Sequence, residues 1–414
     1  MRLIFINRYF YPDHSPTSVL VSDLAFALSQ RDVSVTVITS RLRYEGGGPL
    51  LPRHDTIQGV DVHRVWTSKR GRSRLLGRSL DYMSFYLTAG WWLWRLARSN
   101  DIVVAKTDPP LLSVIAAPIA WLKGARLVNW LQDMFPEVAE ALNVGGNLGH
   151  TIFRLLRPLR NWSFRLAETN VVVGEAMAAR LRSEGIAPER ICVIPNWSDG
   201  ALIVPIAATQ NKLRKSWAPK DHFVVGYAGN LGRVHDVDTI IEAMKRAAGL
   251  PADDVARRIT FLFVGGGVGR AGLERQVLQR RLPNVRLYPY QPQEVLAETL
   301  NAADLHLVSL NPALEGLIVP SKFYGIAAAG RPMVFIGAAD GEIARLIEEI
   351  GCGFTVAPGD GQALLDRIRQ MARDPELCES MGARARAAFV KRWDKEQAVA
   401  QWAVLLREQP RSDN

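Results

Sequence analysis

Short apolar runs alternate along the chain with longer stretches in which apolar residues recur every three or four positions. The short runs are rich in Val and Ile and predict buried strands, while the longer stretches predict amphipathic helices. Strands separated by helices predict parallel βαβ units, so the pattern indicates an α/β fold. In the first half, strands are expected at residues 3–6, 34–39, 60–65, 102–105, 126–130, 170–173 and 191–194.

The alternation is interrupted once and then restarts. Residues 200–221 are polar and irregular and predict a linker between two halves. Two doubly wound halves fit the 414 residues, and a last amphipathic helix is expected near residues 397–408. In such sheets ligands bind at the carboxyl ends of strands, so chemistry is expected in the loops that follow strands. Strands of the second half are expected at residues 223–227, 259–264, 285–288, 305–309 and 333–336.

A glycine-rich turn, YAGNLGR, follows the first strand of the second half at residues 227–233. Glycine lets the backbone approach a phosphate closely, and the next helix N-terminus offers unpaired N–H groups. Arg233 adds a positive charge beside Gly229 and Asn230. The turn is therefore a candidate phosphate site, with an ordinary strand-to-helix turn as the alternative.

A second turn, FLFVGGGVGRAG at residues 261–272, formally contains the GxGxxG dinucleotide fingerprint. That fingerprint expects an acidic residue at the end of the next strand, to hold a ribose. Here the next strand ends in YPY at residues 288–290. An NAD-dependent enzyme is therefore disfavoured, although this alternative stays open.

A third motif, VPSKFYGIAAAGRPMVF, occupies residues 319–335. Ser321 is expected to cap a helix that Gly330 ends. Lys322 lies in the first turn of this helix, where a lysine opposes the helix dipole unless it meets an anion. The motif therefore predicts a second anion contact.

Taken together, these motifs resemble the retaining nucleotide-sugar glycosyltransferases of family 4, and most closely the bacterial enzymes of polysaccharide and O-antigen assembly, such as colanic acid and fucosamine transferases. The resemblance implies the GT-B fold: two Rossmann-like doubly wound domains facing a central cleft, with a C-terminal helix that crosses back. The matching segments keep their order along the chain: FYPDHSPTS, TDPPLL, LQDMFPE, IPNWSD, YAGNLGR, FVGGG, PSKFYGIAAAGRP and DGEIARLI.

The resemblance implies an acceptor-binding domain at residues 1–199, the linker at 200–221, a nucleotide-sugar domain at 222–390 and a returning helix with its tail at 391–414. No cofactor and no metal ion is expected, because backbone dipoles and basic side chains would stabilise the departing diphosphate. The seven histidines are scattered along the sequence and suggest no metal-ligand cluster. The positions that the resemblance assigns to the sugar nucleotide are Gly229, Asn230, Arg233, Gly265, Gly266, Ser321, Lys322 and Glu342.

Candidate catalytic residues lie in the first domain. Asp108 and Asp133 follow strands, where acids that activate the acceptor would lie, and helix capping is the alternative for both. Many family members have His-Asp where this chain has Gln132-Asp133, so a histidine role would pass to Gln132 or be absent. His14 in the first loop is a further candidate, with an ordinary exposed histidine as its alternative.

The chain departs from the family pattern at one further place. Many members carry two glutamates eight residues apart, but the residue eight positions after Glu315 is Phe323. The usual second glutamate aligns with Gly325, so its ribose contact is not expected. We interpret this as a subgroup variant, with a catalytically dead or scaffold homologue as the alternative.

The net charge of +10 favours an anionic partner. Residues 64–98 hold eight basic residues and one acid, together with Trp91, Trp92 and Trp94. Such a composition is typical of a membrane-interface element, and also of a single-stranded nucleic-acid platform. A core-packed helix after a solvated basic loop explains it equally well.

The expected location is the cytoplasm, peripheral at the inner face of the membrane. The N-terminus lacks a signal-peptide core, and the most apolar run, residues 111–122, falls short of the about 20 residues that a span needs. Three cysteines cannot form a disulfide framework.

The expected function is retaining transfer of a sugar from a UDP- or GDP-sugar to a lipid-linked or saccharide acceptor in cell-surface polysaccharide or lipopolysaccharide biosynthesis. The expected partners are the nucleotide-sugar, the acceptor and an anionic membrane surface, and not nucleic acid. The alternatives are a UDP-GlcNAc 2-epimerase-like enzyme, an NAD-dependent oxidoreductase and a non-catalytic basic binding protein.

Overall fold

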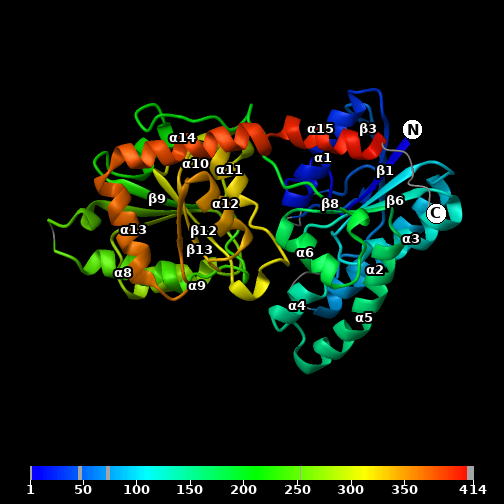
Figure 1. The fold of residues 1–414 in the computed structure, drawn as a ribbon, viewed down its shortest axis with the longest axis horizontal. Helices are drawn as coiled ribbons and strands as arrows, with labels where there is room; N and C mark the ends of the chain where they lie inside the picture. Colours follow the sequence, from blue (N-terminus) through cyan, green and yellow to red (C-terminus); the bar gives the residue numbers. More distant parts are fainter. Residues whose placement is uncertain (1, 45–48, 71–74, 252, 408–414) are drawn as a thin grey trace. The chain divides into compact units, whose positions relative to one another are not determined.

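The computed structural model describes residues 2–44, 49–70, 75–251 and 253–407. The chain forms two compact units, each a parallel-sheet α/β domain (Figure 1). The first unit contains Met1–Pro195 and Val399–Asn414, and the second contains Asn196–Ala398.

The first unit is built on an eight-stranded sheet. Its strands are β1 (Arg2–Ile6), β2 (Ser34–Ser40), β3 (His54–Ile57), β4 (Val60–Val65), β5 (Ile102–Lys106), β6 (Arg126–Trp130), β7 (Thr169–Val172) and β8 (Ile191–Val193). They are ordered β3-β4-β2-β1-β5-β6-β7-β8, and every neighbouring pair is parallel except the β3–β4 hairpin. The order reverses between β1 and β5, which is where doubly wound sheets bind ligands.

Helices cover both faces of this sheet (Figure 1). They are α1 (Pro16–Ser29), α2 (Leu75–Leu96), α3 (Leu112–Lys123), α4 (Glu137–Ala141), α5 (Gly146–Leu166), α6 (Glu175–Ser183), the 3-10 helix η1 (Pro188–Arg190) and α15 (Lys395–Arg407). Phe85 and Leu93 of α2 pack with α3 residues against one face. On α15, Trp402 is fully buried, with its ring 4.8 Å from that of Trp130. The last helix therefore returns to the first unit, as predicted.

The second unit is built on a six-stranded, wholly parallel sheet. Its strands are β9 (Phe223–Ala228), β10 (Ile259–Val264), β11 (Val285–Tyr288), β12 (Leu305–Ser309), β13 (Met333–Ile336) and β14 (Gly353–Val356). The order is β11-β10-β9-β12-β13-β14, so the reversal falls between β9 and β12. The loops after β9 and its neighbours are therefore the expected ligand site of this unit.

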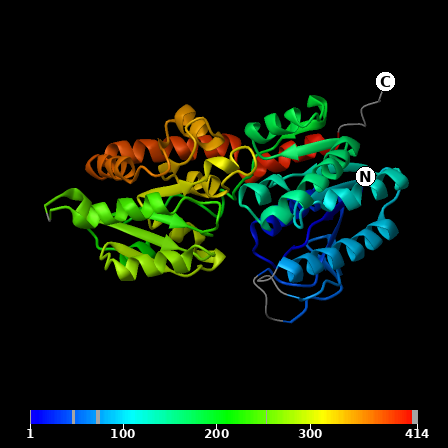
Figure 2. The same ribbon diagram turned by 90° about the horizontal axis from the view of Figure 1, so that it is seen from below.

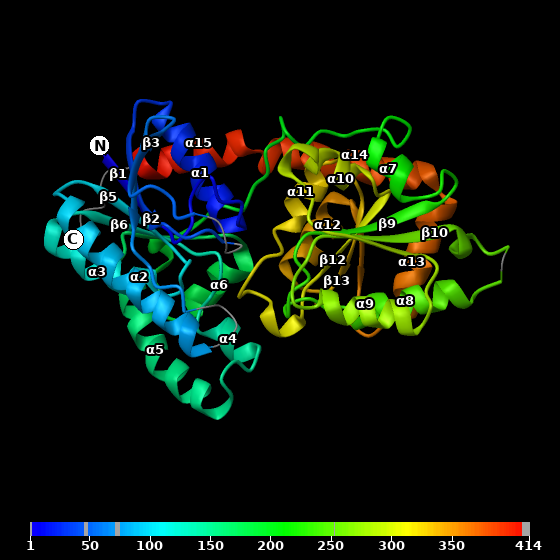
Figure 3. The same ribbon diagram turned by 180° about the vertical axis from the view of Figure 1, so that it is seen from behind.

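The helices of the second unit also form two layers, with α8, α9 and α13 on one side of the sheet (Figure 2, Figure 3). The helices are α7 (Lys212–Trp217), α8 (Asp238–Gly249), α9 (Arg270–Gln279), α10 (Leu296–Asn301), α11 (Lys322–Ala328), α12 (Glu342–Ile350), α13 (Gly361–Arg373) and α14 (Pro375–Arg392), with the 3-10 helices η2 (Val255–Arg258), η3 (Gln293–Val295) and η4 (Pro312–Leu314).

The structure corrects the predicted linker at residues 200–221. This stretch belongs to the second unit and contains α7, which Asn211 caps by accepting from the Arg214 N–H at 2.9 Å. Trp217 is buried and stacks on the ring of Tyr288 at 4.5 Å. Polar composition misled the prediction because one buried tryptophan anchors an otherwise polar segment.

Two strands were not predicted from the sequence. β3 reads HDTI and has no apolar run, and β14 reads GFTV and is only partly buried. Both lie at the edge of their sheet, where pairing needs less apolar surface. Among the residues that the structure describes, no helix combines the length and apolarity that a bilayer span requires.

Candidate active site

Two glycine-rich turns lie side by side at the carboxyl ends of β9 and β10. The Gly229 N–H donates to the carbonyl of Val264 at 2.8 Å, and the Leu231 N–H donates to the carbonyl of Gly266 at 2.7 Å. Backbone therefore packs directly against backbone where the two strands end. These bonds, together with that from the Gly265 N–H to the carbonyl of Tyr288 at 3.0 Å, fix the two turns against each other at the carboxyl ends of their strands.

The geometry of these turns requires glycine. Gly229 has a φ of +112° and Gly265 a φ of +137°, values that residues with a Cβ rarely adopt. A Cβ at Gly265 would also clash with the carbonyl oxygen of Gly229. A Cβ at Gly266 would lie 2.7 Å from the ring of Tyr290. The predicted glycines are thus fixed by packing.

The packing does not match the dinucleotide fingerprint. Gly272, its third glycine, lies in α9, and no atom lies within 4 Å of the position that a Cβ would take there. In the fingerprint, that glycine permits close contact between helix and strand. The resemblance of residues 267–272 to GxGxxG is therefore formal only.

Lys322 opens α11 and reaches over the first glycine turn. Its Nζ donates to Tyr227 Oη at 2.6 Å and to the carbonyl of Asn230 at 2.7 Å. It also lies 3.1 Å from His235 Nε2. Its side chain passes so close to Gly229 that a Cβ there would lie 3.1 Å from Lys322 Cε. The structure therefore brings Lys322 and the turn together, as predicted.

The positive charge of Lys322 has no acidic partner among the described residues. Its hydrogen-bond partners are a phenol, a carbonyl and an imidazole. Burial lowers the pKa of Lys322 to about 7. Burial, aided by the charge of Lys322, lowers the pKa of His235 to about 4, so this imidazole is neutral and can accept. A bound anion would restore the lysine to its charged form.

His235 was not predicted as a site residue. Its Nδ1 lies 2.8 Å from the carbonyl of Ser309, which can only accept, so Nδ1 carries the proton and Nε2 faces Lys322. Asp236, next in the chain, accepts from the Thr239 N–H at 2.9 Å, a capping contact at the start of α8. Sequence position alone does not show that His235 contacts Lys322 whereas its neighbour Asp236 makes a helix-capping contact.

Three further residues were predicted to contact the sugar nucleotide: Asn230, Arg233 and Ser321. Asn230 and Arg233 are exposed, and Arg233 makes no ion pair within the described part of the chain. Ser321 precedes α11 but its hydroxyl makes no cap hydrogen bond, so the capping prediction is wrong. Its backbone is already helical, which points the hydroxyl away from the first-turn N–H groups.

Glu342 is the first residue of α12, and its backbone N–H contacts the carboxylate of Glu315. The Glu342 N–H donates to Glu315 Oε1 at 2.7 Å, so Glu315 caps this helix. Burial, together with the charge of Glu342, raises the pKa of Glu315. The side chain of Glu342 lies 3.6 Å from Arg345. Glu315 thus orients the segment that carries Glu342 even though the usual second glutamate is absent.

In the first unit, a buried lysine lies beneath the predicted acids. Lys106 ends β5, and its side chain is 1% exposed. Its Nζ lies 3.4 Å from the centre of the Trp130 ring and makes no hydrogen bond among the described residues. Burial lowers the pKa of Lys106 well below its ordinary value, although Asp108 and Asp133 oppose this.

The structure brings Asp108 and Asp133 together at the ends of β5 and β6. Burial of its carboxyl group raises the pKa of Asp133 to about 6, and the charge of Asp108 adds to this shift. The residue as a whole is nevertheless exposed at the carboxyl end of β6. Within the described residues Asp133 makes no capping hydrogen bond, which removes that alternative for it. Asp108 Oδ2 accepts from Thr17 Oγ1 at 3.1 Å.

Gln132 lies beside the two acids, whereas His14 makes no described contact with them. The Gln132 N–H donates to Thr107 Oγ1 at 3.1 Å, and its buried Nε2 has no hydrogen-bond partner in the part of the chain described. His14 is exposed in the loop before α1, and no described contact joins it to the two acids. The structure thus groups Gln132, but not His14, with Asp133.

Sequence reasoning missed a second buried cation near these acids. Arg8 follows β1, is 4% exposed and lies 3.9 Å from Asp81. The backbone N–H of Arg8 donates to the carbonyl of Asp108 at 2.7 Å, and this bond joins the loops that follow β1 and β5. A basic residue at or shortly after the end of a buried strand, as at Lys106 and Arg8, was the available signal.

The predicted basic surface at residues 64–98 is only partly a surface. Arg64 is buried and donates to the carbonyl of Tyr11 at 3.1 Å and to Asp55 at 3.4 Å, so its role is structural. Arg72 and Arg74 lie outside the described residues. On α2 one face is buried in the core, whereas the other is exposed.

Two family models match the chain, one in each half. A Glycosyl transferase 4-like domain matches residues 17–197, and Glycosyl transferases group 1 matches residues 209–388. The chain belongs to the GT-B glycosyltransferases. The expected family is therefore confirmed, and a transferase is favoured over the oxidoreductase and the non-catalytic alternatives.

Bacterial proteins named as glycosyltransferases are similar to this glycosyltransferase. It is 26% identical over 352 residues to a protein of Pseudomonas aeruginosa named as the glycosyltransferase WbjE, with 84% of each chain covered. It is 28% identical over 328 residues to WcaI of Escherichia coli K12, named for colanic acid biosynthesis, with 78% of this chain and 77% of the relative covered.

Solved structures confirm the expected fold of the glycosyltransferase. Sucrose-phosphate synthase from Thermosynechococcus elongatus superimposes with a TM-score of 0.77 at 17% identity, covering 98% of both chains. Anabaena HepE in complex with UDP-glucose gives a TM-score of 0.71 at 18% identity, covering 98% of this chain and 99% of HepE.

Proposed function

We propose that this glycosyltransferase moves a sugar from a UDP- or GDP-sugar to a lipid-linked or saccharide acceptor in bacterial surface-polysaccharide assembly, with retention of configuration. The observation that carries the proposal is Lys322, a half-buried ammonium group without an acidic partner in the described structure, fixed over the Gly229 turn. The names of WbjE and WcaI and the UDP-glucose complex of HepE support it.

The donor diphosphate would bind at the paired glycine turns. Gly229 lies beside both Gly265 and the side chain of Lys322. The N–H groups of the two glycines already donate to the carbonyls of Val264 and Tyr288, so Lys322 is the group that would meet the diphosphate. A phosphate oxygen would replace one of the neutral acceptors of the lysine Nζ, a charge-assisted hydrogen bond that is stronger than the one it displaces. Exposed Arg233 would add a second positive charge.

Leaving-group stabilisation follows from the same contacts. As the bond between the anomeric carbon and the phosphate oxygen breaks, negative charge grows on the diphosphate, and Lys322 and the backbone dipoles meet it. The acceptor hydroxyl would attack on the face that the diphosphate leaves, passing its proton to the leaving phosphate oxygen. No metal ion is needed for this step.

The acceptor would bind to the first unit. Asp133, with its pKa raised to about 6, is largely ionised at neutral pH and would accept a hydrogen bond from an acceptor hydroxyl other than the attacking one, which orients the acceptor. The cavity beneath, lined by Lys106, Asp133 and Arg160 among others, measures about 10 Å³ and is too small for a sugar. The acceptor would therefore contact Asp133 from its exposed side.

An anionic membrane surface is the proposed partner of α2. Its outward face exposes apolar side chains beside cations: Arg95 lies over Trp91, and Lys123 lies over Trp94 at 4.2 Å. Aromatic and basic groups together favour the interface of an anionic bilayer. The exposed apolar residues of α2 are Leu80, Met83, Leu87, Trp91 and Trp94.

A thermal-shift panel of UDP, GDP, ADP, their sugars and NADH tests the proposed function. A bound nucleotide raises the melting temperature by mass action. We expect selective stabilisation by UDP or GDP and their sugars and none by ADP or NADH. A protein that no nucleotide stabilises, or that NADH stabilises, contradicts the proposal.

A further inference from the structure

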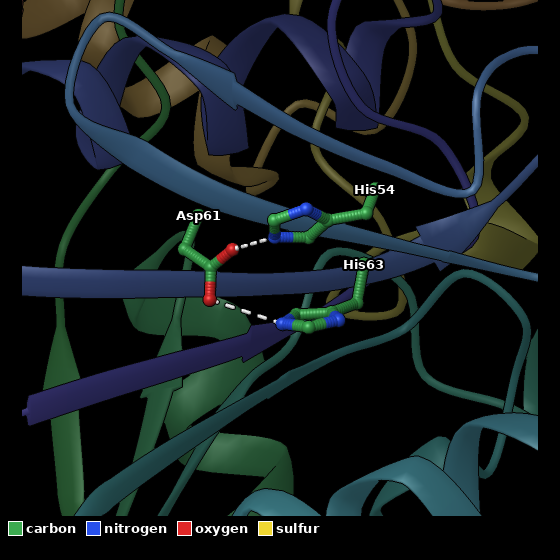
Figure 4. A group of neighbouring side chains, drawn as sticks. All are labelled: His54, Asp61 and His63. Carbon is green, nitrogen blue, oxygen red and sulfur yellow. Dashed lines mark hydrogen bonds and ion pairs between the residues drawn. The ribbon is translucent and has the colours of Figure 1, made fainter.

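Three potential metal ligands lie on one face of the β3–β4 hairpin (Figure 4). His54 of β3 is directly opposite His63 of β4 in the antiparallel register. Asp61 precedes His63 by two positions, and side chains two apart on a strand share a face. The hairpin therefore gathers residues that the sequence spaces irregularly, and the expectation of scattered histidines does not hold for this pair.

The three side chains converge closely. His54 Nε2 lies 2.6 Å from Asp61 Oδ1, and His63 Nε2 lies 3.0 Å from Asp61 Oδ2 (Figure 4). The two imidazole rings are 4.9 Å apart, and one ligand atom from each of the three residues lies within 4.8 Å of the others. Small side-chain rotations would bring these atoms around one ion.

The cluster combines one ligand that is fixed by packing, His63, with two that are accessible to solvent, His54 and Asp61. The side chain of His63 is 14% exposed, and its ring packs against that of Trp92 of α2 at 4.9 Å. The side chains of His54 and Asp61 are 60% and 43% exposed. An ion from solvent can therefore reach a ligand set that is already partly ordered.

We propose that His54, Asp61 and His63 form a binding site for a divalent transition-metal ion of the Zn²⁺ class. Two imidazole nitrogens and one carboxylate suit Zn²⁺, Ni²⁺ or Cu²⁺ better than Mg²⁺ or Ca²⁺, which prefer oxygen ligands. Three protein ligands leave a position for water. This site lies on the edge hairpin of the first unit and is distinct from the proposed donor site of the second unit.

A bound ion would fasten the edge of the sheet. Among the described residues, β3 is the outermost strand of the sheet and has β4 as its one neighbour. The ion would join the two strands through side chains, in addition to their backbone hydrogen bonds. Through His63 it would also stiffen the contact with Trp92, and thus the packing of α2 on the sheet.

Isothermal titration with Zn²⁺ tests the site on untagged, full-length protein stripped with a chelator. We expect one Zn²⁺ per chain. His54→Ala, an exposed change that spares the core, and Asp61→Asn should each weaken binding at least about tenfold. His150→Ala, an exposed histidine on α5, serves as the matched control and should bind as the wild type does.

Tryptophan fluorescence provides a second readout. Cu²⁺ bound at His63 should quench Trp92, and the quenching should be lost in His54→Ala and strongly reduced in Trp92→Phe, which still binds Zn²⁺. If the wild type binds no Zn²⁺, or if His54→Ala and Asp61→Asn bind it as tightly as the control, the cluster is only a hydrogen-bonded His–Asp–His group and the proposal is overturned.

Discussion

The Nζ of Lys322 lies 2.6 Å from the hydroxyl of Tyr227 and 4.3 Å from the centre of its ring. The two residues are far apart in sequence, one at the end of β9 and the other at the start of α11. Their contact holds an ammonium group over the Gly229 turn. The Tyr227 ring compensates part of the cost of burying this charge, because its face attracts cations.

Replacement of this lysine should separate activity from stability. We expect Lys322→Met to lower kcat/KM for sugar transfer at least about a hundredfold, or about 2.7 kcal/mol, because the departing diphosphate loses its cation. The melting temperature of the free protein should not fall, since burying a charge is costly. Lys391→Met, at an exposed site on α14, is the control and should leave both quantities unchanged.

Donor affinity should fall with rising pH. The pKa of Lys322 is about 7 in the free protein, and a bound diphosphate raises it. Below pH 7 the lysine is charged in both states, so affinity is constant. Above pH 7 the free protein must take up a proton to bind, so affinity should fall by up to about tenfold per pH unit. Calorimetry in buffers of different ionisation enthalpy measures this uptake, and its absence would contradict the role of Lys322.

Activity should also fall on the acid side. The pKa of Asp133 is about 6, and the proposed contact needs the ionised form, so kcat/KM should decline as pH drops through this value. Asp133→Asn should lower kcat/KM about a hundredfold and remove this acid limb. Asp32→Asn, at an exposed turn, should keep the wild-type profile. If kcat/KM of Asp133→Asn still declined at acid pH as in the wild type, the decline would belong to another group.

The glycine turns provide a test of geometry without a change of charge. Gly265→Ala should abolish nucleotide-induced stabilisation, because its Cβ clashes with the Gly229 carbonyl and its φ is +137°. Gly272→Ala, in open space within α9, should retain nucleotide binding and stabilise the protein by about 0.5–1 kcal/mol. Thermal unfolding with and without nucleotide measures both effects. Equal responses of the two variants would argue against a specific turn.

Vesicle binding tests the exposed face of α2. Trp91→Ser combined with Trp94→Ser should lower co-sedimentation with anionic vesicles several-fold without changing nucleotide affinity. Leu278→Ser, which removes a comparably exposed apolar side chain from the second unit, should have no effect. Unchanged binding of the double variant to anionic vesicles would refute the membrane proposal.

The sequence predicted the strands well wherever apolar runs were long. β4, β6, β10, β11, β12 and β13 have the predicted bounds. For β10 and β13 the reason is that parallel strands buried on both faces read as continuous apolar segments. The last helix was predicted from its amphipathic pattern, and its return to the first unit from the family resemblance. The short β3, by contrast, becomes a strand only through pairing with β4, and HDTI carries no such signal.

The site was predictable only where a motif fixes the backbone. Gly229, Gly265 and Lys322 could be named as candidates because strand, glycine and helix start follow one another in sequence. Lys106 and His235 were missed because their roles depend on burial and on distant partners, Trp130 for one and Lys322 for the other. The pairing of His54 with His63 likewise depends on strand register, which their separate positions do not reveal.

The most direct test of the donor site is calorimetric titration of the preferred nucleotide-sugar into wild type, Lys322→Met and Lys391→Met. The account predicts that wild type and Lys391→Met bind with equal affinity, whereas Lys322→Met loses at least about a hundredfold. Equal affinity of Lys322→Met and wild type would contradict the placement of the diphosphate at Lys322 and the Gly229 turn.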